Sequence, residues 1–168
     1  MQKIFFSGIF PSMNKKNSSH SHSTLSRVMS PLDANHYGYV HGGAIMRYVD
    51  EAAAISAIKH AGRNVVTASM DHMSFETPVH IGHLLILNSS VNFVGSTSME
   101  IGVKIETENP RTGKRHRVGS AYVTMVALDD LGKPTQVPGL VLETKQDKER
   151  NKRAQQRRKF RLQQRGKK

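Results

Sequence analysis

The feature of this sequence that most limits its possible folds is one long apolar helix with no second helix like it. Residues 43–60 have the run Ala-Ala-Ala in their middle, and Gly62 follows as a C-terminal stop signal. A helix of this length is about 27 Å long. One stripe at helical spacing consists of Ile45, Val49, Ala52 and Ile55. Since further apolar residues lie on the other sides, we expect other structure to surround this helix.

The remainder of the folded region is predicted to form strands. Alternation with a period of two is clearest over residues 97–108, which indicates a strand with one buried face. Further strands are predicted over residues 24–31, 64–73, 84–94 and 118–128. The order is one strand, one helix and then four strands. It predicts an α+β protein in which an antiparallel sheet of five or six strands curls around one long central helix.

The positive charge of the chain is concentrated at its C-terminal end. The net charge is +12, of which residues 145–168 supply +10 and residues 1–144 supply +2. We therefore predict a disordered N-terminal segment 1–23, a folded domain 24–142 and a solvated basic tail 143–168. A nearly neutral domain argues against a fold dedicated to nucleic acid, and only the tail is expected to attract polyanions.

Composition excludes several further classes of site. The chain has no cysteine, which excludes disulfides, thiolate metal ligands and cysteine nucleophiles. No apolar run approaches the length of a membrane-spanning helix, and the first residues lack the apolar region and cleavage site of a signal peptide. We therefore expect a cytoplasmic protein.

One carboxylate interrupts the apolar helix. Asp50 lies two turns inside it, where a smooth apolar surface has no structural need for an acid. Such a carboxylate can act as a general base or attack a carbonyl carbon directly, and the sequence does not separate these two roles. The ordinary alternative is a solvated or salt-bridged aspartate.

The residues before the helix offer groups that complement Asp50. Free N–H groups in the first helical turn favour negative charge, and Gly42 and Gly43 let a carbonyl oxygen approach them closely. Asn35 offers an amide that can orient a carbonyl group or a water molecule. Taken singly, Asn35 would form a turn and His41 would be a structural histidine. Only the combination of these residues with Asp50 favours a catalytic site.

Three stretches carry a resemblance to a known family. They are PLDANHYGYVHGGAIMRYVDEAA at 31–53, VVTASMDHMSFETPVHIG at 65–82 and VNFVGSTSMEIGVKIETENPRTGKR at 91–115. In this order they resemble the hotdog-fold acyl-CoA thioesterases, in the acyl-CoA hydrolase branch, over about residues 24–142. The resemblance implies hydrolysis of acyl-CoA in lipid metabolism, without a cofactor or metal. It also implies homodimers, commonly assembled as hexameric trimers of dimers, in which Asn35 and Asp50 of different subunits form the catalytic pair.

The resemblance also implies a set of substrate-binding residues. The family's CoA-contacting turn corresponds to Gly95, Ser96, Thr97 and Ser98, although Ser96 stands where the family usually has arginine. Arg111 and Arg115 are candidates to supply the missing phosphate contact. His41, Thr67 and Ser69 complete the predicted set.

Two other functional classes stay open at the level of sequence. A non-catalytic acyl-CoA-binding or sensing protein can share the fold, although Asp50 argues against it. Attachment of the basic tail to RNA or to an anionic surface is the second alternative. The acyl chain length is not predicted, because side chains at a subunit interface are expected to set it.

Overall fold

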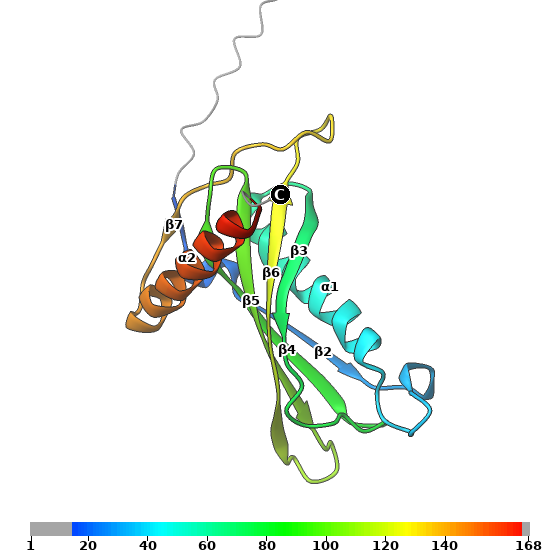
Figure 1. The fold of residues 1–168 in the computed structure, drawn as a ribbon. Coiled ribbons are helices and arrows are strands. Elements are labelled where there is room, and N and C mark those ends of the chain that lie inside the picture. The colour runs from blue at the N-terminus through cyan, green and yellow to red at the C-terminus, as the bar shows by residue number, and fades with distance from the viewer. Residues whose placement is uncertain (1–14, 166–168) are drawn as a thin grey trace, which may run out of the picture.

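The computed structural model describes residues 15–165, which form a five-stranded sheet, a two-stranded ladder and two long helices (Figure 1). In chain order the elements are β1 (Lys16–Asn17), the 3-10 helix η1 (Ser18–Ser21), β2 (Ser23–Val28), the 3-10 helix η2 (Pro31–Asp33), α1 (Gly42–Ala61), β3 (Val65–Met73), β4 (Leu84–Val94), β5 (Ser98–Glu108), β6 (Arg115–Ala127), β7 (Leu140–Val141) and α2 (Lys145–Arg165).

The five-stranded sheet confirms the α+β architecture expected from the sequence. Its strand order is β2-β4-β5-β6-β3, and every neighbouring pair is antiparallel. The sheet curls around α1, which crosses one of its faces (Figure 1). The predicted limits of the helix and strands differ from the observed ones by at most three residues. Gly62 ends α1 with a φ of +69°, as a C-terminal glycine stop requires.

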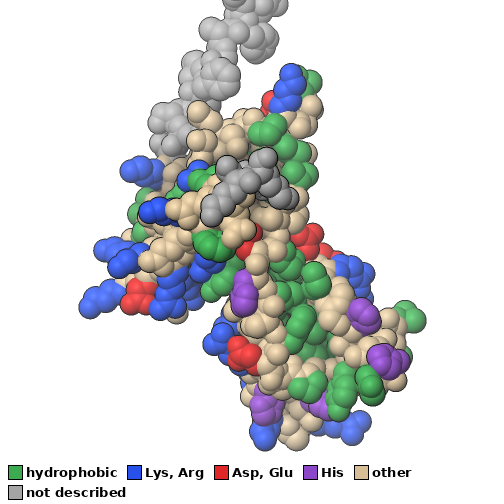
Figure 2. Space-filling model, viewed as in Figure 1, with side chains coloured by type: hydrophobic (Ala, Val, Ile, Leu, Met, Phe, Trp, Pro, Cys, Tyr) green, Lys and Arg blue, Asp and Glu red, His purple; other side chains and the backbone are tan. Residues whose placement is uncertain are grey.

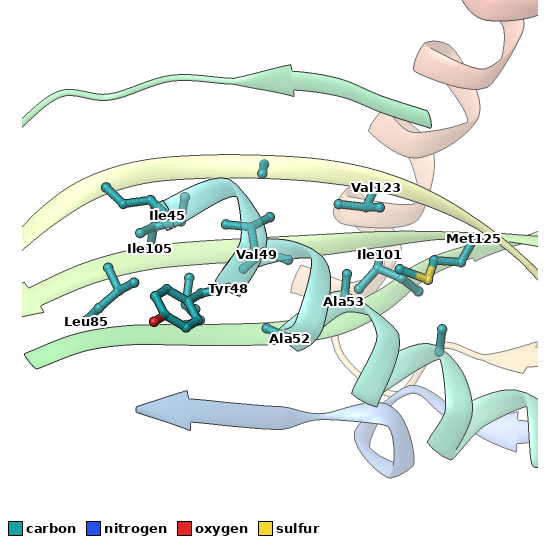
Figure 3. Close-up of a cluster of buried hydrophobic side chains, with 14 of the residues drawn as sticks. Ile45, Tyr48, Val49, Ala52, Ala53, Leu85, Ile101, Ile105, Val123 and Met125 are labelled. Atoms are coloured by element: carbon teal, nitrogen blue, oxygen red, sulfur yellow. The ribbon is translucent and has the colours of Figure 1, made fainter. Parts of the chain in front are cut away.

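The inner face of the sheet and α1 form the hydrophobic core. Figure 3 shows apolar side chains of the two elements directed at one another. From α1 these include Ile45, Tyr48, Val49, Ala52 and Ala53, and from the sheet Leu85, Ile101, Ile105, Val123 and Met125. Each is at most 3% exposed. Full burial of one large apolar side chain contributes about 1.5–3 kcal/mol, so this contact holds α1 to the sheet.

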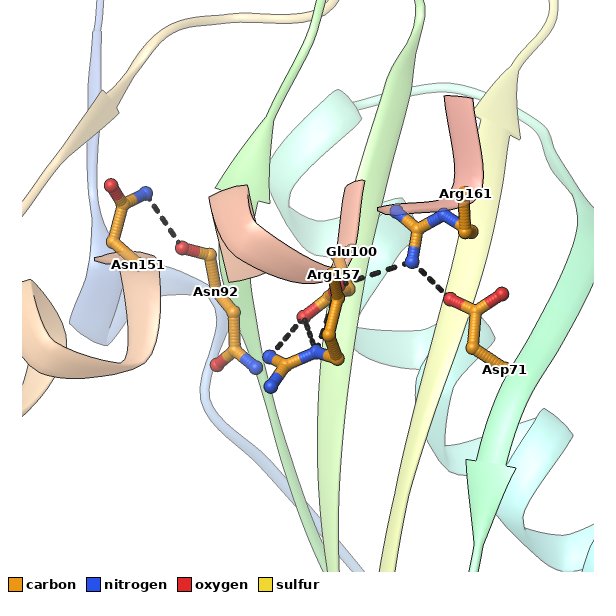
Figure 4. Close-up of polar contacts among 6 residues, drawn as sticks. All are labelled: Asp71, Asn92, Glu100, Asn151, Arg157 and Arg161. Atoms are coloured by element: carbon orange, nitrogen blue, oxygen red, sulfur yellow. Dashed lines mark hydrogen bonds and ion pairs between the residues drawn. The ribbon is translucent and has the colours of Figure 1, made fainter. Parts of the chain in front are cut away.

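The outer face of the same sheet is polar. Strand residues that alternate with the core residues point to this face, and several of them are buried although they are polar. Ser90 is 8% exposed, Asn92 is 4% exposed and Glu100 is 1% exposed. Figure 4 shows α2 lying over this face, with Arg157 and Arg161 directed at Glu100.

The expectation of a solvated C-terminal tail is wrong for residues 145–165. They form α2, whose Ala154 is fully buried and whose Asn151 Nδ2 donates to the backbone oxygen of Asn92 at 2.8 Å. The side of α2 away from the sheet carries the basic side chains that gather over it in Figure 2. The tail has no apolar stripe, and α2 packs instead through one alanine and several polar side chains.

The expectation of disorder over residues 1–23 is also wrong where the structure describes this segment, while residues 1–14 lie outside the described residues. Residues 15–23 contain β1 and η1. Ser18 and Ser21 are buried, and Ser18 Oγ donates to Asp147 Oδ2 at 2.9 Å. Ser21 Oγ accepts from the Val91 N–H at 3.0 Å. Small polar side chains therefore attach this segment by hydrogen bonds rather than by apolar burial.

Strand β3 lies at an edge of the sheet and is irregular. Within the described part of the chain it pairs only with β6, and the register shifts between Thr67 and Ser69 and again between Met70 and His72. Ala68 and Asp71 are therefore bulge residues. Bulges bend a strand and redirect its side chains, which explains why residues 64–73 show no regular alternation in the sequence.

Candidate functional site

The loop between η2 and α1 fixes the side chain of Asn35. Its Oδ1 accepts hydrogen bonds from the N–H groups of Tyr37 at 2.9 Å and Tyr39 at 3.2 Å. Because two N–H groups donate to it, the atom that faces the loop is the amide oxygen, and the amide nitrogen Nδ2 points away from the loop. Nδ2 makes no hydrogen bond to any residue that the structure describes. Asn35 can therefore donate to a ligand but cannot accept from one.

At the start of α1, one of the two N–H groups that were predicted to bind an oxyanion is already hydrogen-bonded within the protein. His41 is the N-cap, and its Nδ1 accepts from the Gly43 N–H at 2.9 Å. A Cβ on Gly43 would stand 3.0 Å from that nitrogen, so a side chain here would have to displace the His41 ring by a few tenths of an ångström. The prediction that both glycine N–H groups are free is wrong for Gly43. The Gly42 N–H has no partner within residues 15–165 and stays available.

A hollow of about 340 Å³ connects Asn35 with Gly42. Apolar side chains form much of its wall, among them Ile45, Phe75 and Val79. The Phe75 ring lies 3.7 Å from where a Cβ on Gly42 would stand, so the ring closes over the helix start. The hollow therefore combines an apolar wall with two N–H donors, which suits a carbonyl group that carries an apolar chain.

Asp50 lies on the partly exposed side of α1 and contacts β3. Its Oδ1 accepts a hydrogen bond from Thr67 Oγ1 at 2.5 Å. Thr67 was predicted to contact substrate, and its observed contact is this carboxylate. Oδ2 of Asp50 makes no hydrogen bond or salt bridge to the described residues. One oxygen of the carboxylate is therefore held in place and the other is free to react.

Within one chain, Asp50 does not meet Asn35 and Gly42. Asp50 lies eight positions after Gly42 in α1, which is about 12 Å along the helix axis. Asp50 is not among the residues that line the hollow. The structure thus brings Asn35 and Gly42 together and places Asp50 with Thr67 in a second group.

The remaining predicted substrate contacts lie at the opposite end of α1 or on the outer face. Ser69 Oγ donates to Asp71 Oδ1 at 3.1 Å. In the turn between β4 and β5, the Gly95 N–H donates to the Ser98 backbone oxygen at 2.7 Å. The backbone oxygens of Ser96 and Thr97, the two residues between them, accept from Val137 and Ala127, respectively.

Arg111 and Arg115 do not replace the arginine that is missing at Ser96 within the same chain. Both lie at the turn between β5 and β6, whereas Ser96 lies at the other end of β5. The 11 residues of that strand extend over about 35 Å. Arg115 is instead paired with Glu108. A cation that the sequence analysis missed does reach the turn: the Arg158 guanidinium lies 3.9 Å from where a Cβ on Gly95 would stand.

A buried network that was not predicted from the sequence holds the Asn35 loop. Asp33 is 6% exposed; its Oδ2 accepts from the Ser30 N–H at 3.0 Å and its Oδ1 from the Tyr48 hydroxyl at 3.1 Å. The Ser30 backbone hydrogen bond holds the pKa of Asp33 below its usual value. The Asp33 backbone oxygen accepts from the His41 N–H at 2.7 Å. The sequence does contain a signal for this network, because Ser-Pro-Leu-Asp at residues 30–33 has the spacing of a capping box.

Two kinds of feature are absent from the described part of the chain. Residues 15–165 contain no cluster of three or more His, Asp or Glu side chains that could hold a metal ion. None of their helices has the length and apolar character needed to cross a membrane.

Comparison with known sequences identifies relatives with consistent names. The model of the thioesterase superfamily matches residues 37–114. The uncharacterized acyl-CoA thioester hydrolase YkhA of Bacillus subtilis is 43% identical over 122 residues, which cover 73% of this chain and 70% of that protein. The cytosolic acyl coenzyme A thioester hydrolase of Rattus norvegicus is 38% identical over 134 residues, 79% of this chain, and the match spans only 35% of the rat protein.

Solved structures agree with these relatives. An acyl-CoA hydrolase from Staphylococcus aureus, solved with butyryl coenzyme A, coenzyme A and coenzyme A disulfide, superimposes with a TM-score of 0.84. It is 38% identical, and the match covers 91% of this chain and 93% of that one. Alanine variants of that hydrolase, at an asparagine, an aspartate and a threonine, have also been solved. An apo hexameric acyl-CoA thioesterase has a TM-score of 0.86 at 36% identity, with 90% of this chain and 97% of that chain covered.

Proposed function

The chain belongs to the hotdog-fold acyl-CoA thioesterases and is an enzyme of that class, and we propose that it hydrolyses acyl-CoA with Asn35, Gly42 and Asp50 as its reacting groups. The observation that carries the proposal is the one free carboxylate oxygen of Asp50 on a helix whose entrance presents two free N–H donors. Residues 24–142 supply all of these groups, which supports the prediction that they form the catalytic domain.

Asn35 and Gly42 polarise the thioester carbonyl. The loop occupies Oδ1 of Asn35, so this oxygen does not accept a hydrogen bond from the attacking water, and Nδ2 donates to the substrate oxygen. The Gly42 N–H adds a second donor at the positive end of the α1 dipole. In other enzymes the loss of one such donor costs about 3 kcal/mol of transition-state stabilisation. The apolar wall of the hollow accepts the first carbons of the acyl chain.

Asp50 supplies the attacking group. The Thr67 hydroxyl fixes Oδ1, and Oδ2 either removes a proton from water or attacks the thioester carbon to give a mixed anhydride, with CoA thiolate leaving in both cases. The three alanine variants of the Staphylococcus aureus hydrolase support this set. Their positions are separated by 15 and then 17 residues, as are Asn35, Asp50 and Thr67.

We further propose that the complete site forms between two subunits. Within one chain Asp50 and the Asn35 hollow stay apart, and the free edge of β3 offers unpaired backbone groups beside Asp50. Exposed apolar side chains surround this region: Met46, Ile55, Ile58, Val66 and Phe75. Edge-to-edge pairing of two β3 strands would bury them. The hexameric structural relative is consistent with further assembly into a trimer of dimers.

CoA phosphates are expected at the turn between β4 and β5. The Gly95 N–H is already bonded to the Ser98 backbone oxygen, so the donors proposed for a phosphate are the hydroxyl groups of Thr97 and Ser98, and Arg158 provides the cation that Ser96 does not. We also propose a cytoplasmic location, supported by the cytosolic rat relative.

Release of free thiol from acyl-CoA tests the proposed reaction. The chain has no cysteine, so a thiol-reactive dye reports only CoA. We expect turnover by the wild type on a panel from acetyl-CoA to palmitoyl-CoA, and a loss of at least about 10²-fold in Asp50→Ala. Glu51→Ala is the matched control, since it removes the next acid on the same helix. Equal turnover in folded Asp50→Ala and Glu51→Ala would refute the role of Asp50.

Mixing two inactive variants tests the shared site. Asn35→Ala and Asp50→Ala proteins are combined, and subunit exchange is verified by mass spectrometry. A mixed dimer then has one site with both wild-type residues, and activity should return to about half of the wild-type value per mixed dimer. Exchange without any recovered activity would show that both residues act within one chain.

A further inference from the structure

We propose that Arg161 of α2 is a positioning residue for catalysis, because it holds the bulged edge strand β3 in the register that presents Thr67 to Asp50. The inference rests on the proposed function, in which the Thr67 hydroxyl orients the reacting carboxylate. It assigns a catalytic consequence to the helix that the sequence analysis treated as a solvated tail.

The anchor of this arrangement is a buried carboxylate on the outer face of the sheet. Glu100 of β5 is 1% exposed. Arg157 binds it with Nη2 at 2.6 Å from Oε1 and with Nε at 3.2 Å from both oxygens. The Arg157 guanidinium also stacks on the Tyr122 ring of β6, 3.5 Å from its centroid. Because charged hydrogen bonds are strong, these contacts with Glu100 fix α2 to the centre of the sheet.

Arg161, one helical turn further along α2, connects this point to the edge of the sheet. Its Nη1 lies 3.4 Å from Glu100 Oε2 on β5 and donates to Asp71 Oδ2 on β3 (Figure 4). Strand β6 lies between β5 and β3. The Arg161 side chain therefore spans three strands and links the edge strand to the centre independently of the β3–β6 ladder.

The position of Asp71 determines what this link can control. Asp71 is the second bulge residue of β3, and the first, Ala68, directly follows Thr67. The register puts Thr67 opposite Met125, whose side chain faces the core, so Thr67 points to the inner face and reaches Asp50 at 2.5 Å. Ser69 lies opposite Thr124 on the other face and donates to Asp71. Both bulges must therefore stay in place for Thr67 to face α1.

Little else in the described residues holds this part of β3. Within a single subunit, before the proposed pairing with β3 of a second subunit, it has a neighbouring strand on one side only, and several of its residues are exposed, including Thr67, Ala68 and His72. Bulges are sites where a ladder can change register, because the bulged residue is not paired. Arg161 is 19% exposed and is bound by two carboxylates, so it restrains the register of β3 next to the second bulge.

The test compares Arg161→Ala with Lys159→Ala in the full chain. Both variants remove one positive charge from the same half of α2, but Lys159 is exposed and contacts neither carboxylate. We expect kcat to fall by about 10-fold in Arg161→Ala, since small misplacements of reacting groups can cost up to 10²-fold. KM should change by less than twofold. Lys159→Ala should match the wild type, with assembly size checked by size-exclusion chromatography for every variant.

Two further measurements separate positioning from simple stabilisation. The pH–activity profile of Arg161→Ala should move in the same direction as that of Thr67→Val, because both loosen the same hydrogen bond. Combining Arg161→Ala with Asp71→Asn should lower kcat no further than Arg161→Ala does alone. Where Arg161→Ala fails to fold, Arg161→Lys serves, since an ammonium group cannot bridge the two carboxylates as a planar fork does.

The outcomes are distinguishable from failure of the proposed function. If Asp50→Ala is inactive while Arg161→Ala keeps the wild-type kcat and pH profile, the thioesterase assignment stands and the positioning role is overturned. A lower melting temperature with unchanged kcat would likewise assign Arg161 to stability alone. A loss of kcat that Asp71→Asn does not share would show that Arg161 does not act through β3.

Discussion

The two long helices lie on opposite faces of one sheet and attach to it by different physical means. Helix α1 buries nine of its 20 residues, mostly aliphatic side chains and alanines, against the inner face. Helix α2 buries Ala154 and Asp147, and it meets the outer face through Arg157, Arg161 and Asn151. Non-directional apolar burial holds the first helix, and directed charged hydrogen bonds hold the second.

This difference predicts different responses to substitution. An apolar interface loses free energy in proportion to the volume removed. A buried ion pair contributes to stability only while both partners are present, because removal of one leaves the other charge buried without a counter-charge. The two helices can therefore be compared through matched changes on each face.

The largest effect is expected from Arg157→Ala. It leaves Glu100 buried without its main partner, and loss of one member of a buried pair typically costs about 3–5 kcal/mol. The double variant Glu100→Leu/Arg157→Met should recover most of this loss, since it removes both charges. Urea denaturation of the two variants and the wild type measures the difference. A double variant less stable than Arg157→Ala would contradict this view of the outer face.

On the inner face, Ile45→Ala should cost about 2–5 kcal/mol through lost burial and a remaining cavity. The cost should be nearly the same at low and high salt, because no charge is involved. Parallel denaturation curves at two ionic strengths check this. A loss that depends strongly on salt would mean that α1 also relies on electrostatic contacts.

The same contrast explains how much of the fold was predictable. The period of 3.6 in α1 and the period of two in residues 97–108 led to correct elements, because both patterns follow directly from one buried apolar face. The docking of α2 has no such pattern. Glu100 occupies an outward strand position where a solvated acid is ordinary, and only its partners from the C-terminal region reveal that it is buried. The start of α2 was readable, since Thr144 and Asp147 form a capping box.

The sequence proposed residues for the candidate site, but it did not predict their contacts. Asp50 stood out as a carboxylate on an apolar helix, and the resemblance implied its pairing with Asn35 of another subunit. The cap that His41 forms with the Gly43 N–H depends on a side-chain conformation that no sequence pattern specifies. The contact between Thr67 and Asp50 depends on bulges that also hide the alternation of β3.

A smaller, pH-dependent effect is expected at the C-terminal end of α1. His60 is fully buried, and its Nε2 donates to the Pro138 backbone oxygen at 2.9 Å, while Nδ1 has no partner in residues 15–165. Burial lowers the pKa of His60 below its ordinary value of 6.5. Below pH 6.5 the unfolded chain takes up a proton at this residue and the folded chain resists it, so stability falls as the pH falls.

His60→Gln should flatten this dependence, because glutamine keeps a donor for Pro138 and does not titrate. The free energy of unfolding is measured from pH 7.5 to pH 5 for both proteins. Identical slopes in the two proteins would assign the acid sensitivity to other groups.

The smallest effect separates the two helices by function rather than by stability. Each helix has a capping side chain, His41 on α1 and Thr144 on α2, and loss of an N-cap usually costs about 1 kcal/mol. His41→Ala and Thr144→Ala should therefore destabilise the protein to a similar degree. Only His41→Ala should also lower turnover, because its cap orients the first turn of α1, where we propose that the Gly42 N–H binds the substrate oxygen. Thr144 lies 17 residues from Arg161, about 26 Å along α2. Fraying at that end therefore leaves the contacts between Arg161 and β3 intact. Melting temperatures and acyl-CoA turnover of the two variants provide the comparison. Equal losses of turnover would mean that the starts of both helices affect the site. The division between α1 as the helix that supplies reacting groups and α2 as the helix that positions β3 would then not hold.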